Sequence, residues 1–331
     1  MLHDYQKYAV RFIEEHPVCA LLLSMGLGKT IITLTALQDL LFDSFDAHRI
    51  LVIAPLRVAQ STWPAEIEKW EQLHELEYSV IKGTPAQRLE ALKRQADIYI
   101  INRENVPWLC QQPFDFDTVV VDELSSFKNH KAKRYKALMS KRPFIKRMIG
   151  LTGTPSSNGL QDLWAEFRLL DQGERLGRFI GAFREAYLRS DRRNGMVVYS
   201  YKPQPGAEEA IYKKISDITI SMKAMDHLAM PELVMIKQEV EMSQSEMDRY
   251  KALKRTLVLD LDGDEITAAN AASLSGKLCQ MASGAIYTED KSWIAIHERK
   301  LDALEDLIES ANSAPILIAY WFKHDLERIK K

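Results

Sequence analysis

Residues 18–42 read VCALLLSMGLGKTIITLTALQDLLF and give the strongest indication of the fold. A short apolar run over 18–24 leads into a glycine turn, and apolar residues then follow at helical spacing over 30–42. This order predicts a strand, a loop and an amphipathic helix. The turn resembles the phosphate-binding pattern G-x-x-x-x-G-K-[ST], except that Leu23 stands in place of the first glycine.

The same alternation continues through the first half of the chain. Apolar runs predict further strands, and helical patterns lie between them over 64–73 and 85–95. Buried strands that alternate with helices predict a parallel sheet covered on both faces, with ligand sites at the carboxyl ends of its strands. The fold class is therefore α/β, with further strands expected over 49–55, 97–101, 117–123 and 147–155.

The pattern changes after about residue 170, which suggests more than one domain. We expect an α/β domain with the phosphate-binding pattern over 1–170 and a mainly helical insertion or linker over 171–230. The remainder, 231–331, is expected to be the start of a second α/β domain that the chain does not complete. The alternative is that its last strand joins the first sheet. Within this part we expect strands over 233–240 and 314–321, a helix over 300–311 and a solvated acidic loop over 260–265.

Composition limits the classes of protein that this chain can belong to. It has 331 residues and a formal net charge of -2, so overall charge gives no argument for a nucleic-acid partner. No apolar run is long enough for a membrane span, and the N-terminus does not look like a signal peptide. We expect a cytoplasmic protein (nuclear if eukaryotic), a monomer, without a membrane partner. The three cysteines are interpreted as buried free thiols rather than as zinc ligands or disulfides.

The glycine turn carries the features of an ATP phosphate site. Its glycines allow backbone N–H groups to face phosphate oxygens, and the following helix adds its positive N-terminal end. Lys29 is expected to reach the β- and γ-phosphates, and the Thr30 hydroxyl to bind Mg²⁺. The predicted cofactors are ATP and Mg²⁺, and the loop residues expected to contact them are Met25, Gly26, Leu27, Gly28, Lys29 and Thr30.

Two carboxylates follow a buried strand over 119–123, VVVDE. A charged group at a buried strand end costs free energy unless a cation offsets it. Asp122 is expected to hold the metal, and Glu123 to orient or deprotonate an attacking water. The predicted catalytic residues are therefore Lys29, Asp122 and Glu123, which implies hydrolysis and not binding alone.

With LTGTP at 151–155, the chain resembles the Swi/Snf-like ATPases of helicase superfamily two, including compact phage and bacterial members. That resemblance implies two RecA-like domains, Gln6 as an adenine contact and duplex DNA as partner. It covers nearly the whole chain and is closest up to residue 170. The segments that carry it are LHDYQ (2–6), MGLGKT (25–30), IAPLRVAQSTWPAEIEKW (53–70), VVDELSSFKN (120–129) and LTGTPSSNGLQDLW (151–164).

The chain departs from the family pattern at several positions. Ser125 replaces the usual histidine after the acidic pair, and Leu23 and Ser24 replace an acidic pair before the phosphate loop. The arginine finger that the resemblance implies for the second domain would lie beyond Lys331. Such a residue contributes about 10³–10⁵ in rate, so this chain is expected to bind ATP but to hydrolyse it weakly or not at all.

Nucleic acid is expected beside the acidic pair. Residues 128–147, KNHKAKRYKALMSKRPFIKR, contain nine Lys or Arg and no Asp or Glu, which suits phosphate neutralisation; a solvated helix face is the alternative. Trp63, Trp70, Trp108 and Trp164 could stack on bases, but we expect each of them to pack in the core. The residues expected to contact nucleic acid or couple it to ATP are Arg57, Gln60, Lys128, Asn129, Thr152 and Thr154.

The leading hypothesis is an ATP-driven translocase on double-stranded DNA. Alternatives are an RNA or single-strand helicase of the same superfamily, a small-molecule kinase built on a phosphate loop, and a catalytically silent nucleic-acid scaffold. The residues Lys29, Asp122 and Glu123 argue against the scaffold, and LTGTP argues against the kinase. The sequence does not identify protein partners, the direction of movement or the biological process.

Overall fold

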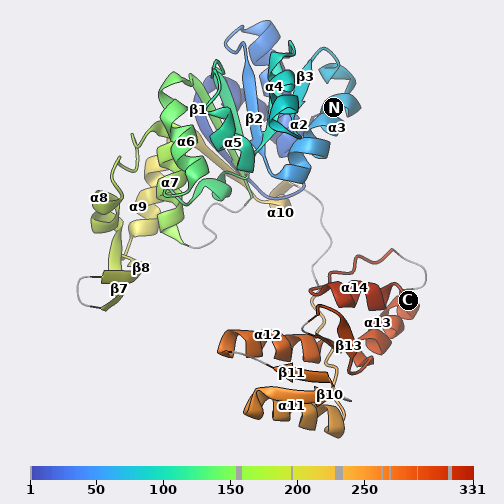
Figure 1. Ribbon diagram of the computed structural model, residues 1–331. Coiled ribbons are helices and arrows are strands. Elements are labelled where there is room, and N and C mark those ends of the chain that lie inside the picture. Colours follow the sequence, from blue (N-terminus) through green and yellow to red (C-terminus); the bar gives the residue numbers. More distant parts are fainter. Residues whose placement is uncertain are drawn as a thin grey trace. The chain divides into compact units, whose positions relative to one another are not determined.

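The computed structural model describes residues 2–153, 159–194, 197–227, 234–261, 264–267, 270–288, 290–311 and 315–331. The chain forms two compact units, Met1–Pro231 and Glu232–Lys331. Figure 1 draws the second unit in orange and red.

A seven-stranded parallel sheet forms the centre of the first unit (Figure 1). The strand order is β3-β4-β2-β5-β6-β1-β9. The predicted α/β fold is confirmed, and so are the five strands expected within residues 1–170. The strands are β1 (Val18–Leu23), β2 (Ile50–Ala54), β3 (Tyr78–Ile81), β4 (Ile98–Asn102), β5 (Thr118–Asp122), β6 (Arg147–Thr152) and β9 (Thr219–Met222).

Alternate side chains of the central strands enter two separate cores, one on each face of the sheet. In β2, Leu51 and Ile53 pack with one core, whereas Val52 packs with the other. One core is covered by α1 (Asp4–Glu15), α2 (Lys29–Gln38) and α3 (Trp63–Lys69). The other is covered by helices that include α4 (Pro85–Lys93), α5 (Val106–Leu109), α6 (Lys133–Lys141) and α7 (Leu160–Asp171). Burial on both faces explains why these strands read as continuous apolar runs.

After α7 the chain leaves the sheet and later returns to its edge as β9. The excursion contains α8 (Ile180–Tyr187), the antiparallel pair β7 (Leu188–Asn194) and β8 (Val197–Pro203), and α9 (Ala207–Ile215). It is followed by β9 and α10 (Ala224–His227). The return is not apparent in the sequence, because β9 is an edge strand of mixed polarity, TISM.

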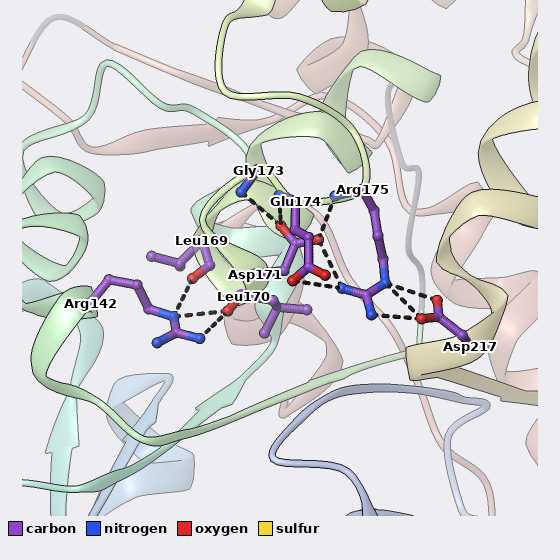
Figure 2. A network of polar contacts seen from close by, with 8 residues as sticks. All are labelled: Arg142, Leu169, Leu170, Asp171, Gly173, Glu174, Arg175 and Asp217. Atoms are coloured by element: carbon purple, nitrogen blue, oxygen red, sulfur yellow. Dashed lines mark hydrogen bonds and ion pairs between the residues drawn. The ribbon is translucent and has the colours of Figure 1, made fainter.

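A polar network fixes the start and end of this excursion (Figure 2). The Asp171 carboxylate accepts backbone N–H bonds from Gly173 at 2.8 Å and from Arg175 at 3.0 Å. The Arg175 guanidinium donates to both carboxylate oxygens of Asp217, which lies two residues before β9. On the other side of Asp171, at the left of Figure 2, Arg142 donates to the carbonyls of Leu169 and Leu170. The network therefore ties the turn after α7 to the entrance of β9.

The second unit contains helices and two short antiparallel strand pairs. Its helices are α11 (Gln244–Thr256), α12 (Ala271–Ala282), α13 (Arg299–Ser310) and α14 (Lys323–Ile329). Its strands are β10 (Val258–Leu261) with β11 (Asp264–Thr267), and β12 (Ala285–Tyr287) with β13 (Trp293–Ala295). The helix expected over 300–311 is confirmed. The acidic stretch 260–265, interpreted above as a solvated loop, instead contributes to both β10 and β11.

Two strands expected in this unit do not form. Residues 234–240 and 315–320 are neither helix nor strand, and Leu317 and Trp321 are 98% and 87% exposed. A strand needs a hydrogen-bonded neighbour, and the described strands of this unit pair only within their two hairpins. An apolar run was therefore insufficient evidence for a strand. The interpretation of the cysteines was also partly wrong, because Cys279 is exposed while Cys19 is buried.

Among the described helices, none has the length and apolar character needed to cross a membrane.

Candidate functional site

The parallel sheet brings the predicted motifs to one edge. The phosphate loop follows β1, the segment with Arg57 follows β2, the acidic pair ends β5 and Thr152 ends β6. Strands β2, β5, β6 and β1 are consecutive neighbours, so all four carboxyl ends lie side by side. This is where an open parallel sheet places its ligand sites.

The phosphate loop has the conformation that its glycines predict. Gly26 and Gly28 have φ values of 83° and 80°, a region that disfavours residues with a side chain. Gly28 is the residue before the first turn of α2, which begins at Lys29. Leu27 is fully buried and anchors the loop, whereas Met25 is 79% exposed. The N-terminal end of α2 is thus open to an anion.

Lys29 lies back across its own loop. Its Nζ donates to the Leu23 carbonyl at 2.9 Å and to the Ser24 carbonyl at 3.5 Å. A Cβ placed on Gly153, just after β6, would lie 3.8 Å from the same Nζ. The lysine therefore sits between the phosphate loop and the segment that follows β6, where it is available to a phosphate group.

Asp122 is held by defined donors at the end of β5. Its side chain is buried, and its Oδ2 accepts a hydrogen bond from the Trp63 indole Nε1 at 3.0 Å. Burial raises the pKa of Asp122 above the usual range, while the bond from Trp63 and the positive charge of Lys29 act in the opposite direction. Burial of a carboxylate costs free energy that one nearby lysine offsets only in part, and a bound metal ion would supply further positive charge.

Glu123 adopts a left-handed backbone conformation, with φ 56° and ψ 61°. Such a conformation is uncommon for a residue with a side chain and is typical of functional turns. It turns the chain out of β5 into the short helical turn Leu124–Phe127. Burial raises the pKa of Glu123, and the neighbouring Asp122 carboxylate raises it further. A raised pKa suits a group that accepts a proton from water.

The predicted adenine contact lies against the phosphate loop. Gln6 is buried, its Nε2 donates to the Leu27 carbonyl at 3.2 Å, and its Oε1 accepts the His3 backbone N–H at 2.9 Å. Tyr5 also donates to the Leu27 carbonyl, at 3.3 Å, and its ring contacts the His227 ring. Helix α1 is thereby attached to the loop through two side chains.

The residues at this edge fit a magnesium nucleotide. The described residues hold no group of three or more His, Cys, Asp or Glu that would make a complete metal site. Mg²⁺ bound with ATP needs only one or two protein oxygens, since phosphates and water supply the rest. Asp122 and the half-buried Thr30, in the first turn of α2, are the protein oxygens suitably placed by their elements.

The residues expected to touch nucleic acid differ in their exposure. Arg57 and Gln60 are exposed on the segment after β2, and Asn129 is exposed after β5. Lys128 forms an ion pair with Asp162 of α7, with 3.5 Å between Nζ and Oδ2. Thr152 is fully buried at the end of β6. Thr154 lies outside the described residues.

The basic run 128–147 is only partly available to phosphate. Arg142 and Arg147 are buried and donate to backbone carbonyls, Arg147 to those of Ile13, Glu14 and His16. Arg134 donates to the Ser126 carbonyl. Structural use of these arginines reduces the basic surface expected from the sequence. The lysines that remain exposed are Lys131, Lys133, Lys136 and Lys146.

Sequence reasoning missed the roles of Trp63 and Tyr5. Trp63 was correctly expected in the core, where it is fully buried, but its hydrogen bond to Asp122 was not predicted. The two residues are 59 positions apart, and only the pairing of β2 with β5 brings their segments together. One feature of the sequence indicated that Trp63 has a role in the site, namely its position within the motif segment 53–70.

A comparison with known protein families leads to the same conclusion as the residues of the site. The SNF2-related domain matches residues 5–284. The chain belongs to the SNF2-related family. This confirms the Swi/Snf-like resemblance, and with it a nucleotide-binding P-loop domain of the helicase-like ATPase class.

Individual relatives extend the comparison. The SNF2-related chain is 39% identical over 317 residues to "Putative protein p41" of Acyrthosiphon pisum secondary endosymbiont phage 1, covering 93% of this chain and 69% of the relative. It is 27% identical to the bovine (Bos taurus) DNA excision repair protein ERCC-6-like, covering 65% of this chain but only 18% of that protein.

Among solved structures, the Sulfolobus solfataricus SWI2/SNF2 ATPase core in complex with dsDNA matches with a TM-score of 0.57. The two chains are 21% identical, and the match covers 94% of this chain and 64% of the archaeal one. This likeness supports the RecA-like fold of the SNF2-related domain. The chain thus spans about two thirds of the archaeal core and of the phage relative, and a small part of the longer repair protein.

Proposed function

We propose that this SNF2-related chain is the ATP-binding core of a translocase that moves along double-stranded DNA. One observation carries the proposal: the ends of β1 and β5 bring Lys29, Asp122 and Glu123 to a single sheet edge. The charge of Lys29 acts on both carboxylates, which indicates that the three groups share one site. ATP with Mg²⁺ is the ligand whose charges match this arrangement.

Each residue has a defined task in this proposal. The loop over 25–30 cradles the phosphates, Lys29 leaves the Leu23 carbonyl to bind them, and Gln6 contacts adenine. Thr30 and Asp122 would hold the Mg²⁺, which neutralises charge on the phosphates when bound. Glu123 orients the attacking water and accepts its proton, a role that its raised pKa favours.

Duplex DNA is proposed as the partner because exposed cations and polar groups flank the same sheet edge. Arg57, Gln60 and Asn129 are exposed after β2 and β5, and Lys128 lies next to Asn129. Contacts of this kind bind the phosphate backbone without reading bases, as a translocase requires. Thr152, inside the fold, would couple the phosphate site to the DNA-facing segments. Thr154 belongs to the same expected motif.

We further propose that residues 1–331 by themselves hydrolyse ATP slowly. Family resemblance implies an arginine finger from a complete second RecA-like lobe, and we interpret unit Glu232–Lys331 as part of that lobe. An absent finger reduces turnover by about 10³–10⁵. A turnover of these residues equal to that of a chain with both lobes would contradict this proposal.

ATPase measurements on a chain extended through the second lobe test the proposal directly. We expect duplex DNA to stimulate hydrolysis more than single-stranded DNA or RNA does. We expect Lys29→Ala to abolish nucleotide binding, and Glu123→Gln to retain binding while losing turnover. Stimulation by RNA alone would favour an RNA helicase instead. DNA-stimulated activity that survives Lys29→Ala would refute the motor.

A further inference from the structure

We propose that Trp63 is a positioning residue for the metal-binding carboxylate Asp122. The inference rests on the proposed function, since it concerns the same site. Its basis is a buried contact: the Trp63 side chain is fully enclosed, and its Nε1 donates to Asp122 Oδ2 at 3.0 Å. Because its side chain is fully buried, Trp63 would act on the site through Asp122.

The chemistry of the indole suits this task. It has one N–H donor and no acceptor, so the bond to the carboxylate has one possible direction. It is also neutral, and it therefore fixes the carboxylate without competing with a cation by charge, as a lysine would. A carboxylate has about four acceptor positions, so the bond from Trp63 leaves room for the metal or its water.

The fold holds the donor rigidly. Trp63 is the first residue of α3 and follows a π-helical turn over Val58–Thr62, which is separated from the end of β2 by residues 55–57. Its ring packs in the core below α2, the helix that begins with Lys29. The same core thus supports the phosphate loop and the partner of Asp122. Partners of this kind orient metal ligands, and their loss typically costs about 10–100-fold in metal affinity.

The test replaces the donor and measures metal-dependent nucleotide binding, without relying on turnover. Trp63→Phe removes the N–H and keeps an aromatic ring. Binding of a fluorescent ATP analogue to the 331-residue chain is titrated with Mg²⁺ and repeated in EDTA. We expect half-saturation to need about tenfold more Mg²⁺ in Trp63→Phe, with binding in EDTA unchanged.

Trp70→Phe provides a matched control. Trp70 lies just after the same helix, and its Nε1 also donates to a carboxylate, Glu66 Oε2, at 2.8 Å. That bond does not involve the sheet edge, so Trp70→Phe is expected to match the wild type. An equal Mg²⁺ requirement in Trp63→Phe and wild type would overturn the inference.

Two further comparisons separate positioning from general loosening of the core. In an Asp122→Asn background, Trp63→Phe is expected to change the Mg²⁺ requirement less than twofold, because its target is already altered. A tenfold effect there as well would overturn the inference. If Trp63→Phe does not fold, benzothienylalanine at position 63 removes the N–H with almost no change in shape, and the same outcomes apply. Wild-type chain that shows no Mg²⁺-dependent binding would refute the proposed function itself.

Discussion

The side chain of Gln6 lies directly against Gly28. A Cβ at position 28 would be 2.5 Å from Gln6 Nε2, which is closer than non-bonded atoms approach. Gln6 occupies this place because its amide donates to the carbonyl of Leu27, the preceding residue. Helix α1 can therefore close on the phosphate loop only where the loop has no side chain. This contact ties the first helix of the chain to the conformation of the ATP site.

We expect Gly28→Ala to weaken ATP binding more than tenfold. The added methyl group would displace Gln6, and φ at 80° costs an alanine about 1–2 kcal/mol. Equilibrium titration with a fluorescent nucleotide measures the effect. Gly181→Ala is the control, because Gly181 lies in α8 with open space around its Cβ position. Helix propensity predicts that this control is stabilised by about 0.5–1 kcal/mol. Equal nucleotide affinity of Gly28→Ala and wild type would show that the loop has another way to accommodate the methyl group.

Gln6→Ala tests whether this contact also selects the base. Removal of the amide is expected to weaken ADP binding several-fold and to leave GDP binding nearly unchanged, so that the preference between them falls. Parallel titrations with the two nucleotides give the ratio. Lys7→Ala, at the exposed neighbouring position, serves as the control. A preference for ADP that persists in Gln6→Ala would assign base selection to other residues.

The sequence was informative where burial imposes a continuous apolar pattern. The central strands β1, β2, β4, β5 and β6 could be predicted because both of their faces are covered. The edge strands β3 and β9 carry polar residues and could not be predicted from apolar runs. Residues 315–320 show the opposite error, since an apolar run without a neighbouring strand stays exposed.

The candidate site was predictable in its chemistry but not in its contacts. The loop with Lys29 and the pair of carboxylates could be identified because few other sequences place these groups at strand ends. The partner of Asp122 could not, because a hydrogen bond across 59 positions has no local pattern. The basic run was misleading for a related reason: Arg142 and Arg147 bind backbone carbonyls, and a sequence does not distinguish that use from phosphate binding.

Asp171→Ala is expected to destabilise the first unit by about 2–4 kcal/mol. The Asp171 side chain is 1% exposed and accepts backbone N–H bonds from Gly173, Glu174 and Arg175 (Figure 2). In Asp171→Ala the N–H groups of Gly173 and Arg175 would lose this acceptor, whereas Glu174 keeps its bond to the Asp171 carbonyl at 3.3 Å. Urea unfolding followed by circular dichroism measures the change. Asp217→Ala is the matched control, because its carboxylate binds the same arginine but is 61% exposed, and we expect a loss below about 1 kcal/mol. Equal losses in both variants would mean that the ion pair, and not the turn, carries the stability.

The last prediction concerns Glu166, which is fully buried in α7. Neither of its carboxylate oxygens has a hydrogen-bond partner within the described part of the chain. Burial, helped by the charge of Asp162, raises the pKa of Glu166 to about 9 from its ordinary 4.5. The folded chain therefore keeps this proton at neutral pH, whereas the unfolded chain loses it above about pH 4.5. Between these values, unfolding releases a proton, and this residue lowers the free energy of unfolding by about 1.4 kcal/mol for each unit of rising pH.

Glu166→Gln keeps the shape of the protonated acid but does not titrate. We expect Glu166→Gln to have the same melting temperature as the wild type near pH 5 and a higher melting temperature at pH 8. The reason is that, at pH 8, only the folded wild type must keep a proton that its unfolded state releases. Thermal unfolding from pH 5 to 9 measures the difference. Glu185→Gln, on the exposed surface of α8, should give a curve parallel to that of the wild type. If the Glu166→Gln and wild-type curves are also parallel, the carboxyl group finds a partner that keeps it ionised, and Lys128, whose charge acts in that direction, is the first candidate to replace.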